Sequence, residues 1–162
     1  MRIAPRNIRL LLMDCDGVLT DGRLYFGPNG EVMKSFHVRD GQGIVYWHRA
    51  GLVSGIISGR RSEGIVEARA KELGIRFVVT GSNNKVADLD HILDETGIPA
   101  EETAFIGDDL GDIGLMKLVG LPVAVADAVE DVKAAASYVT KAKGGEAAVR
   151  EVVDLLLTAR LD

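Results

Sequence analysis

Residues 10–22 read LLLMDCDGVLTDG, and this stretch decides the fold that we expect for the chain. Four apolar residues run without a break into Asp14 and Asp16, which stand one residue apart. A short continuous apolar run of this kind is typical of a strand that is buried on both faces of a sheet. Buried carboxylates are costly unless a charged group answers them, so the pair predicts a functional site where this strand ends.

Short apolar runs and helical patterns alternate along the rest of the chain. Strands are expected over residues 8–13, 52–58, 75–80, 103–107 and 121–126. Helices are expected over residues 62–74, 84–97, 110–120 and about 146–159, with Ser62 and Asn84 as N-caps and Gly74, Gly97 and Gly120 as C-terminal stops. Such alternation predicts an α/β fold, a Rossmann-like parallel sheet with helices on both faces.

One segment interrupts the alternation before the first helix. Residues 23–38, RLYFGPNGEVMKSFHV, alternate apolar and polar side chains around Gly27-Pro28-Asn29-Gly30. This pattern predicts a β-hairpin with Asn29-Gly30 as its turn signal. We expect the hairpin to project from the sheet as a flap, and residues 1–162 to form a single domain, because no internal repeat or linker is present.

Composition excludes several classes of protein. The formal net charge is -5, and the lysines and arginines are scattered, which argues against a nucleic-acid-binding protein. The only cysteine, Cys15, rules out an intramolecular disulfide framework and fits a reducing compartment. No stretch reaches the length of a membrane span, so we expect a cytoplasmic protein without a membrane partner.

Polar residues follow several predicted strands at the point where each strand ends. In sheets of this type, ligands bind beyond the carboxyl ends of the strands. Four groups of residues are expected there: Asp14-Cys15-Asp16-Gly17, Ser58-Gly59-Arg60, Lys85 at the start of the helix that follows GSNN, and Gly107-Asp108-Asp109-Leu110-Gly111-Asp112. Any one aspartate at such a position is usually a turn former or an N-cap, so the interpretation depends on their combination.

Carboxylates on two adjacent strand ends would repel one another without a cation between them. Ligands that are all oxygen suit Mg²⁺, which takes one or two carboxylates and keeps several waters. With Mg²⁺ bound, Asp14 would stay ionised and could attack phosphorus, and Asp16 could carry the proton for the leaving alcohol. Ser58 and Lys85 would stabilise the phosphoryl oxygens, where charge lies in the transition state.

These four groups, in this order, resemble the four motifs of the haloacid dehalogenase superfamily of phosphatases. The stretches DGVLTDG, FHVRDGQGI, ISGR, GDDLGD, VAVADA and KGGEAAVREV are similar to the family that hydrolyses 3-deoxy-D-manno-octulosonate (KDO) 8-phosphate. The resemblance implies a Mg²⁺-dependent homotetramer that makes KDO and inorganic phosphate for lipopolysaccharide synthesis.

The resemblance also implies roles for individual residues. Asp14, the main-chain carbonyl of Asp16 and Asp108 would be the metal ligands, with Asp109 and Asp112 close by. Gly59, Arg60 and Arg69 would bind the sugar acid. A planar guanidinium matches a carboxylate at two points, which makes Arg60 the main candidate for reading the substrate carboxylate.

The chain has no space for the cap domain that often shields such sites. Only residues 17–57 separate Asp16 from Ser58, and only residues 86–107 separate Lys85 from Asp108. An uncapped cleft would leave the reaction open to water. The flap would meanwhile expose an unusual amount of apolar surface, so we expect neighbouring subunits to cover it and to close the site. The apolar residues concerned are Leu24, Tyr25, Phe26, Val32, Met33 and Phe36.

Three alternatives remain open at this point. A related sugar-acid phosphate, such as the nine-carbon KDN 9-phosphate, could be the substrate. A signalling receiver domain also combines acidic residues, Mg²⁺ and lysine, but Asp16 would have no role in it. A non-catalytic assembly domain with the same fold would not need all four groups of residues.

Overall fold

The computed structural model describes residues 4–62 and 64–161, and its centre is a six-stranded sheet in which neighbouring strands are parallel. The strands are β1 (Leu10–Met13), β4 (Val53–Ser58), β5 (Phe77–Thr80), β6 (Thr103–Gly107), β7 (Leu121–Ala124) and β8 (Tyr138–Val139). Their order across the sheet is β5-β4-β1-β6-β7-β8. The carboxyl end of β1 therefore lies between those of β4 and β6.

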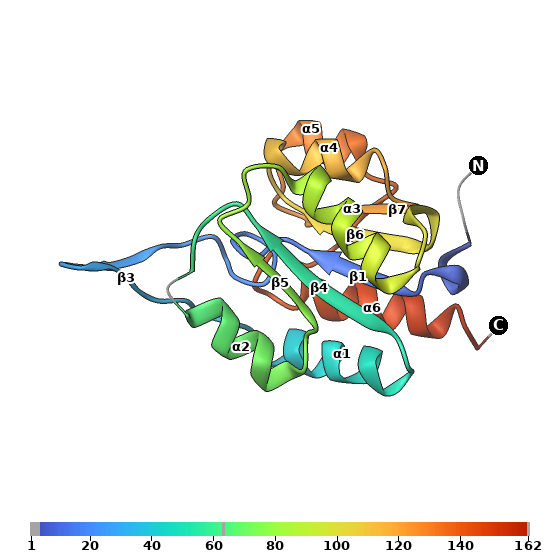
Figure 1. Cartoon of the computed structure of the whole chain (residues 1–162), viewed down its shortest axis with the longest axis horizontal. Helices are drawn as coiled ribbons and strands as arrows, with labels where there is room; N and C mark the ends of the chain where they lie inside the picture. Colours follow the sequence, from blue (N-terminus) through green and yellow to red (C-terminus); the bar gives the residue numbers. More distant parts are fainter. Residues whose placement is uncertain (1–3, 63, 162) are drawn as a thin grey trace.

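Helices cover both faces of this sheet (Figure 1). Helices α1 (Val38–Arg49), α2 (Ile65–Leu73) and α6 (Ala148–Thr158) lie on one face, and α3 (Lys85–Thr96), α4 (Ile113–Met116) and α5 (Glu130–Ala135) lie on the other. Three short 3₁₀ helices, η1 (Pro5–Asn7), η2 (Ala100–Glu102) and η3 (Leu110–Asp112), occur in connections. The predicted α/β fold is confirmed. Within the described residues, no helix combines the length and apolar character that crossing a membrane requires.

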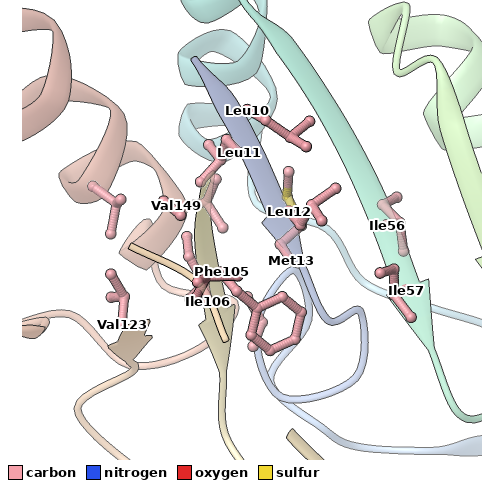
Figure 2. Packing of buried hydrophobic residues seen from close by; sticks show 14 of the residues in the cluster. Leu10, Leu11, Leu12, Met13, Ile56, Ile57, Phe105, Ile106, Val123 and Val149 are labelled. Carbon is pink, nitrogen blue, oxygen red and sulfur yellow. The ribbon is translucent and has the colours of Figure 1, made fainter. Parts of the chain in front are cut away.

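The core is centred on β1, whose four residues are all buried. Figure 2 shows side chains of β1 packed among those of β4, β6, β7 and α6, including Ile56, Phe105, Val123 and Val149. Both faces of the strand are therefore covered, as its continuous apolar run predicts. This packing gives the residues that follow Met13 a rigid support.

Several element boundaries differ from those expected. Asn84 caps α3 by accepting from the Ala87 N–H, and Gly74 and Gly97 end their helices in the left-handed conformation, as predicted. The expected cap Ser62 is wrong, because α2 begins only at Ile65 and the Ser62 hydroxyl accepts from a residue inside the helix. The predicted 11-residue helix over 110–120 is also wrong.

That segment forms η3 and the short helix α4, which ends at Met116. Its first turn carries a capping box in which the side chains of Asp109 and Asp112 each accept from the other's backbone N–H. Gly120 does not end a helix, because it packs against the backbone of Glu101. Strand β8 was not expected, since two residues carry no detectable pattern.

The predicted flap is present and projects from the carboxyl edge of the sheet (Figure 1). Strands β2 (Tyr25–Gly27) and β3 (Gly30–Met33) pair antiparallel around Pro28 and Asn29, so the turn is centred one residue earlier than expected. Gly30 begins β3 with a φ of +119°, a value that favours glycine. Only this flap and α1 occur in the described connection from β1 to β4, so no cap domain is inserted there.

The apolar residues of the flap fall into two groups. Leu24, Phe26, Val32 and Met33 are exposed, as expected. Tyr25 is only half-buried, and Phe36 packs against the core at the base of the flap. The four exposed residues give the projecting part of the flap an apolar surface.

Candidate active site at the carboxyl edge of the sheet

A cavity of about 250 Å³ opens where β1, β4 and β6 end and where α3 begins. Its lining contains every predicted site residue except Arg69, namely Asp14, Asp16, Ser58, Gly59, Arg60, Lys85, Asp108, Asp109 and Asp112, together with Gly111. Parallel strands bring their carboxyl ends to one edge, which explains why residues so distant in sequence meet.

Lys85 lies between two of the carboxylates in this cavity. Its Nζ atom lies 3.0 Å from Asp14 Oδ2 and 2.7 Å from Asp112 Oδ1. Burial alone would lower the pKa of Lys85, but the charges of Asp14 and Asp112 outweigh it and hold that pKa above its ordinary value. The ammonium group is therefore charged at neutral pH and available to a phosphoryl oxygen.

Three carboxylates in the cavity could hold a metal ion. Oxygen atoms of Asp14, Asp108 and Asp112 all lie within 4.8 Å of one another. Burial raises the pKa of Asp14 to about 6, and burial together with the charges of Asp14 and Asp112 raises the pKa of Asp108 to about 7. Asp108 Oδ1 is buried and has no hydrogen-bond partner among the described residues. The carboxylates repel one another, and one of their oxygens lacks a hydrogen bond within the described part of the chain. Such a cluster fits a divalent cation such as Mg²⁺.

The other acidic residues of the last motif have different surroundings. Asp112 is buried, and its Oδ2 accepts from the N–H groups of Asp108 and Asp109 at 2.9 and 3.3 Å. Asp109 is exposed, and its carboxylate accepts from the Leu110 N–H. Asp112 therefore shapes the loop and also faces the carboxylate cluster, whereas the side chain of Asp109 caps η3 and lies outside the cluster of three.

Asp16 has partners that the sequence did not reveal. Its Oδ1 lies 2.5 Å from Lys34 Nζ, and the Lys34 side chain, which comes from the base of the flap, is only 1% exposed. Lys34 also pairs with Glu31 at 2.9 Å. A lysine in a projecting hairpin is expected to face solvent, and no spacing signals a pair with an aspartate 18 residues earlier. Neither Lys34 nor Glu31 was predicted as a site residue.

The two arginines predicted to bind the substrate, Arg60 and Arg69, have different surroundings. Arg60 lines the cavity with its side chain 44% exposed. Arg69 is not among the residues that line the cavity; its guanidinium lies over the Phe36 ring and pairs with Glu72 at 2.7 Å. Within a single chain, therefore, the geometry supports a substrate contact for Arg60 but offers none for Arg69.

The loop that carries Asp16 packs tightly on both sides. A Cβ atom at Gly17 would overlap the Asp108 carboxylate, and a Cβ atom at Gly144 would overlap the carbonyl group of Gly17. Gly145 N–H donates to Val18 O at 2.9 Å and ties the two segments together. Residues 143–145 thus support the loop from behind, at a distance that only glycine permits.

Comparison with known proteins is consistent with this geometry. Residues 55–152 match the family model described as haloacid dehalogenase-like hydrolase. The 3-deoxy-D-manno-octulosonate 8-phosphate phosphatase KdsC of Escherichia coli K12 is 47% identical over 154 residues, which cover 95% of this chain and 81% of the relative.

Two solved structures are similar over nearly the whole chain. A 3-deoxy-D-manno-octulosonate 8-phosphate phosphatase from Yersinia pestis has a TM-score of 0.94 and 45% identity, covering 97% of this chain and 84% of that one. The corresponding enzyme from Moraxella catarrhalis, solved with a magnesium ion, a phosphate ion and KDO, has a TM-score of 0.93 and 37% identity. That match covers 98% of this chain and 90% of the Moraxella chain.

Proposed function

The chain belongs to the haloacid dehalogenase-like hydrolases, and within them to the 3-deoxy-D-manno-octulosonate 8-phosphate phosphatases, so we propose that it hydrolyses KDO 8-phosphate to KDO and inorganic phosphate. It is accordingly an enzyme, a phosphoric monoester hydrolase. By the same resemblance, the KDO would serve lipopolysaccharide precursor synthesis. The observation that carries the proposal is the meeting of Asp14, Asp16, Ser58 and Lys85 around one cavity.

With these side chains, the proposed reaction proceeds in two steps. In the first, a carboxylate oxygen of Asp14 bonds to phosphorus while the bond from phosphorus to the sugar oxygen breaks, and Asp16 gives that oxygen its proton. In the second, Asp16 takes a proton from water, the water oxygen bonds to phosphorus, and the bond to Asp14 breaks. Lys85 and the buried Ser58, which both line the cavity, would donate hydrogen bonds to the phosphoryl oxygens throughout.

Asp14 and Asp108 are the residues proposed to hold Mg²⁺, with the main-chain carbonyl of Asp16 and with Asp112 beside them. When bound, the ion would offset the negative charge that gathers on the phosphoryl oxygens. Asp109 remains a predicted neighbour of the metal, and its contacts do not support a role as a ligand.

Metal affinity is expected to depend on pH. Since a metal binds carboxylates only in their ionised form, protons compete for Asp14 and Asp108, whose pKa values in the metal-free protein are raised to about 6 and about 7. The apparent Mg²⁺ affinity should therefore fall roughly tenfold or more from pH 8 to pH 6, with proton release on binding. Calorimetric titration in buffers of different ionisation enthalpy would measure both. An affinity that stays constant over this range would contradict the assignment of these ligands.

Arg60 is the residue proposed to bind the carboxylate of the sugar acid. Hydrogen bonds to a charged group contribute about 1.5–3 kcal/mol, so Arg60→Ala should raise KM for KDO 8-phosphate about tenfold or more. The KM for a sugar phosphate without a carboxylate should change little in the same variant. Phosphate release would be measured with and without Mg²⁺ on KDO 8-phosphate, KDN 9-phosphate and glucose 6-phosphate.

The same panel tests the proposed substrate directly. Wild-type protein should release phosphate fastest from KDO 8-phosphate and not at all when chelator removes the metal. Faster hydrolysis of KDN 9-phosphate would show that the nine-carbon sugar acid, and not KDO 8-phosphate, is the substrate. Equal increases in KM for all substrates in Arg60→Ala would refute the proposed role of Arg60.

The proposed assembly is a homotetramer in which neighbouring chains cover the exposed residues of the flap. Phe26 and Val32 are 64% and 63% exposed, more apolar surface than an isolated hairpin normally presents to water. Sedimentation at micromolar concentration should show about four chains per particle, a number that follows from the family resemblance.

Substitution of two exposed side chains of the flap should separate assembly from folding. The double substitution Phe26→Asp and Val32→Asp is expected to give smaller particles with reduced activity. Leu118→Asp, at an exposed apolar residue outside the flap, is the matched control and should leave the particle size unchanged. An active monomer at assay concentration would overturn the proposal.

A further inference from the structure

Four charged side chains form a closed ring at one side of the cavity. Lys34 Nζ contacts Asp16 Oδ1 at 2.5 Å and Glu31 Oε1 at 2.9 Å, and Arg60 lies 3.4 Å from Glu31 Oε2 and 3.6 Å from Asp16 Oδ2. Positive and negative groups alternate around the ring. Two of its members, Glu31 and Lys34, come from the flap, and Asp16 comes from the loop that follows β1.

The members of this ring differ in exposure. The side chains of Lys34, Glu31 and Asp16 are 1%, 9% and 15% exposed, whereas that of Arg60 is 44% exposed. An interaction shielded from solvent is much less weakened by water and salt than a surface pair. The pair between Lys34 and Asp16 is therefore the firm part of the ring, and Arg60 is the part that can move.

The two oxygens of Asp16 have unequal surroundings. Oδ1 receives the lysine, whereas Oδ2 is buried and has no hydrogen-bond partner among the described residues. Oδ2 lies on the side of Arg60, which lines the cavity. The lysine thus holds one oxygen of the carboxyl group, and the other, 3.6 Å from Arg60 Nε, has no hydrogen bond from the described residues and lies on the side of the cavity-lining arginine.

We propose that Lys34 is a positioning residue for proton transfer, which holds Asp16 by Oδ1 so that Oδ2 faces the leaving oxygen of the substrate. The proposal rests on the proposed phosphatase function and extends it to a residue of the flap. In the first step, the proton moves from Asp16 Oδ2 to the sugar oxygen as its bond to phosphorus breaks. In the second step, Oδ2 takes a proton from the attacking water. A proton donor must lie within hydrogen-bond distance of the atom it serves, so fixing the side chain matters.

A purely structural role, in which the lysine only anchors the flap, predicts a different pattern of losses. Loss of a positioned acid affects a substrate with a poor leaving group, because the sugar alkoxide needs a proton as it departs. It hardly affects p-nitrophenyl phosphate, whose leaving anion is stable without one. Damage to folding or to the flap as a whole would lower the rates for both substrates alike.

The test compares kcat/KM for KDO 8-phosphate and p-nitrophenyl phosphate, because this ratio includes only steps up to the transfer to Asp14. Lys34→Met should lose about tenfold or more on the sugar phosphate and less than about threefold on the aryl phosphate. Lys133→Met, which removes a comparable 2.9 Å pair with Glu130 on α5, is the matched control and should change neither value. Activity of the wild-type protein on both substrates tests the proposed function independently of this comparison.

A double-mutant cycle distinguishes action through Asp16 from every other effect. If Lys34 acts only by holding that carboxyl group, adding Lys34→Met to Asp16→Asn should cause no further loss on KDO 8-phosphate. Should Lys34→Met fail to fold, Lys34→Arg takes its place, because the planar guanidinium keeps the charge but cannot hold Oδ1 in the same position. A uniform loss on both substrates, no loss on either, or additive losses in the cycle would each overturn the proposal.

Discussion

Asp14→Asn is expected to lower kcat at least about a thousandfold on every phosphate ester that the protein hydrolyses. The amide cannot attack phosphorus as a carboxylate does, and one of the three clustered carboxylates is lost with it. The nucleophile and the metal site are thus damaged by a single atom change. The measurement is the steady-state rate at saturating Mg²⁺ and substrate.

The same variant should fold as well as the natural chain. In the metal-free protein, burial raises the pKa of Asp14 from 3.8 to about 6, so its ionised form is less stable in the folded state than in the unfolded one. The folded state therefore binds more protons between about pH 4 and 6, and stability falls as pH rises through that window. A neutral amide removes this cost at neutral pH. Lys85 then loses its ion pair with residue 14 and keeps the one with Asp112.

Two measurements decide whether Asp14 acts in this way. The thermal midpoint of metal-free Asp14→Asn should be no lower than that of the wild type, as is common where function and stability conflict. Asp131→Asn, at an exposed position on α5, should alter neither midpoint nor rate. Near-normal turnover by folded Asp14→Asn would refute the assignment of the nucleophile.

The fold was predictable because its strongest signals are local. The apolar run over residues 10–13 is buried on both faces as its pattern indicates, and the alternation around Pro28 and Asn29 forms the hairpin. Once a parallel sheet is predicted, the carboxyl ends of its strands must share one edge. Asp14, Ser58 and Asp108 could therefore be grouped from the order of the strands and motifs along the chain.

What the sequence did not reveal are contacts that depend on three-dimensional direction. Lys34, just after β3, meets Asp16 in the loop after β1, and no residue period predicts that contact. Arg69 was expected in the site, but its position on α2 directs it over Phe36. A contact at the N-terminus of α6 was equally hidden in the sequence. There the Arg150 N–H donates to the distant and buried Asp40 instead of to a local cap.

The flap combines two roles that would otherwise seem unrelated. It exposes Phe26 and Val32, and it carries Glu31, the strand partner of Phe26, and Lys34 into the ring around Asp16. Covering Phe26 and Val32 in an assembly would steady Glu31 and Lys34, because these residues lie on one hairpin. Assembly and proton transfer would then be linked through a short stretch of backbone.

Gly144→Ala is expected to lower kcat/KM at least about a hundredfold, although Gly144 touches no substrate. The added methyl group would overlap the carbonyl group of Gly17 and lie 3.1 Å from the Val18 nitrogen, and backbone atoms cannot rotate out of the way as side chains do. Retreat of the segment is opposed by hydrogen bonds of 2.9 Å from Gly144 N–H to Asp127 Oδ1 and from Gly145 N–H to Val18 O.

The displacement must therefore pass to the loop that carries Asp16. That loop has little freedom, because Gly17 already packs against the Asp108 carboxylate and has a φ of +89°. A shift of about 1 Å in a catalytic group is enough to cost about a hundredfold in rate. The loss should appear on KDO 8-phosphate and on p-nitrophenyl phosphate alike, since Asp14 and Asp108 move with the loop.

Gly120→Ala separates this effect from simple destabilisation. A methyl group there would overlap the Glu101 carbonyl, again a collision with backbone, but Gly120 directly precedes β7 at the amino edge of the sheet, away from the cavity. Both variants should unfold at lower temperature than the wild type, and rates per folded molecule should fall only for Gly144→Ala. Equal losses in the two variants, or a folded Gly144→Ala with normal rates, would show that residues 143–145 do not position the catalytic loop. The distinction is sharp because the two glycines meet the same kind of obstacle at opposite edges of one sheet.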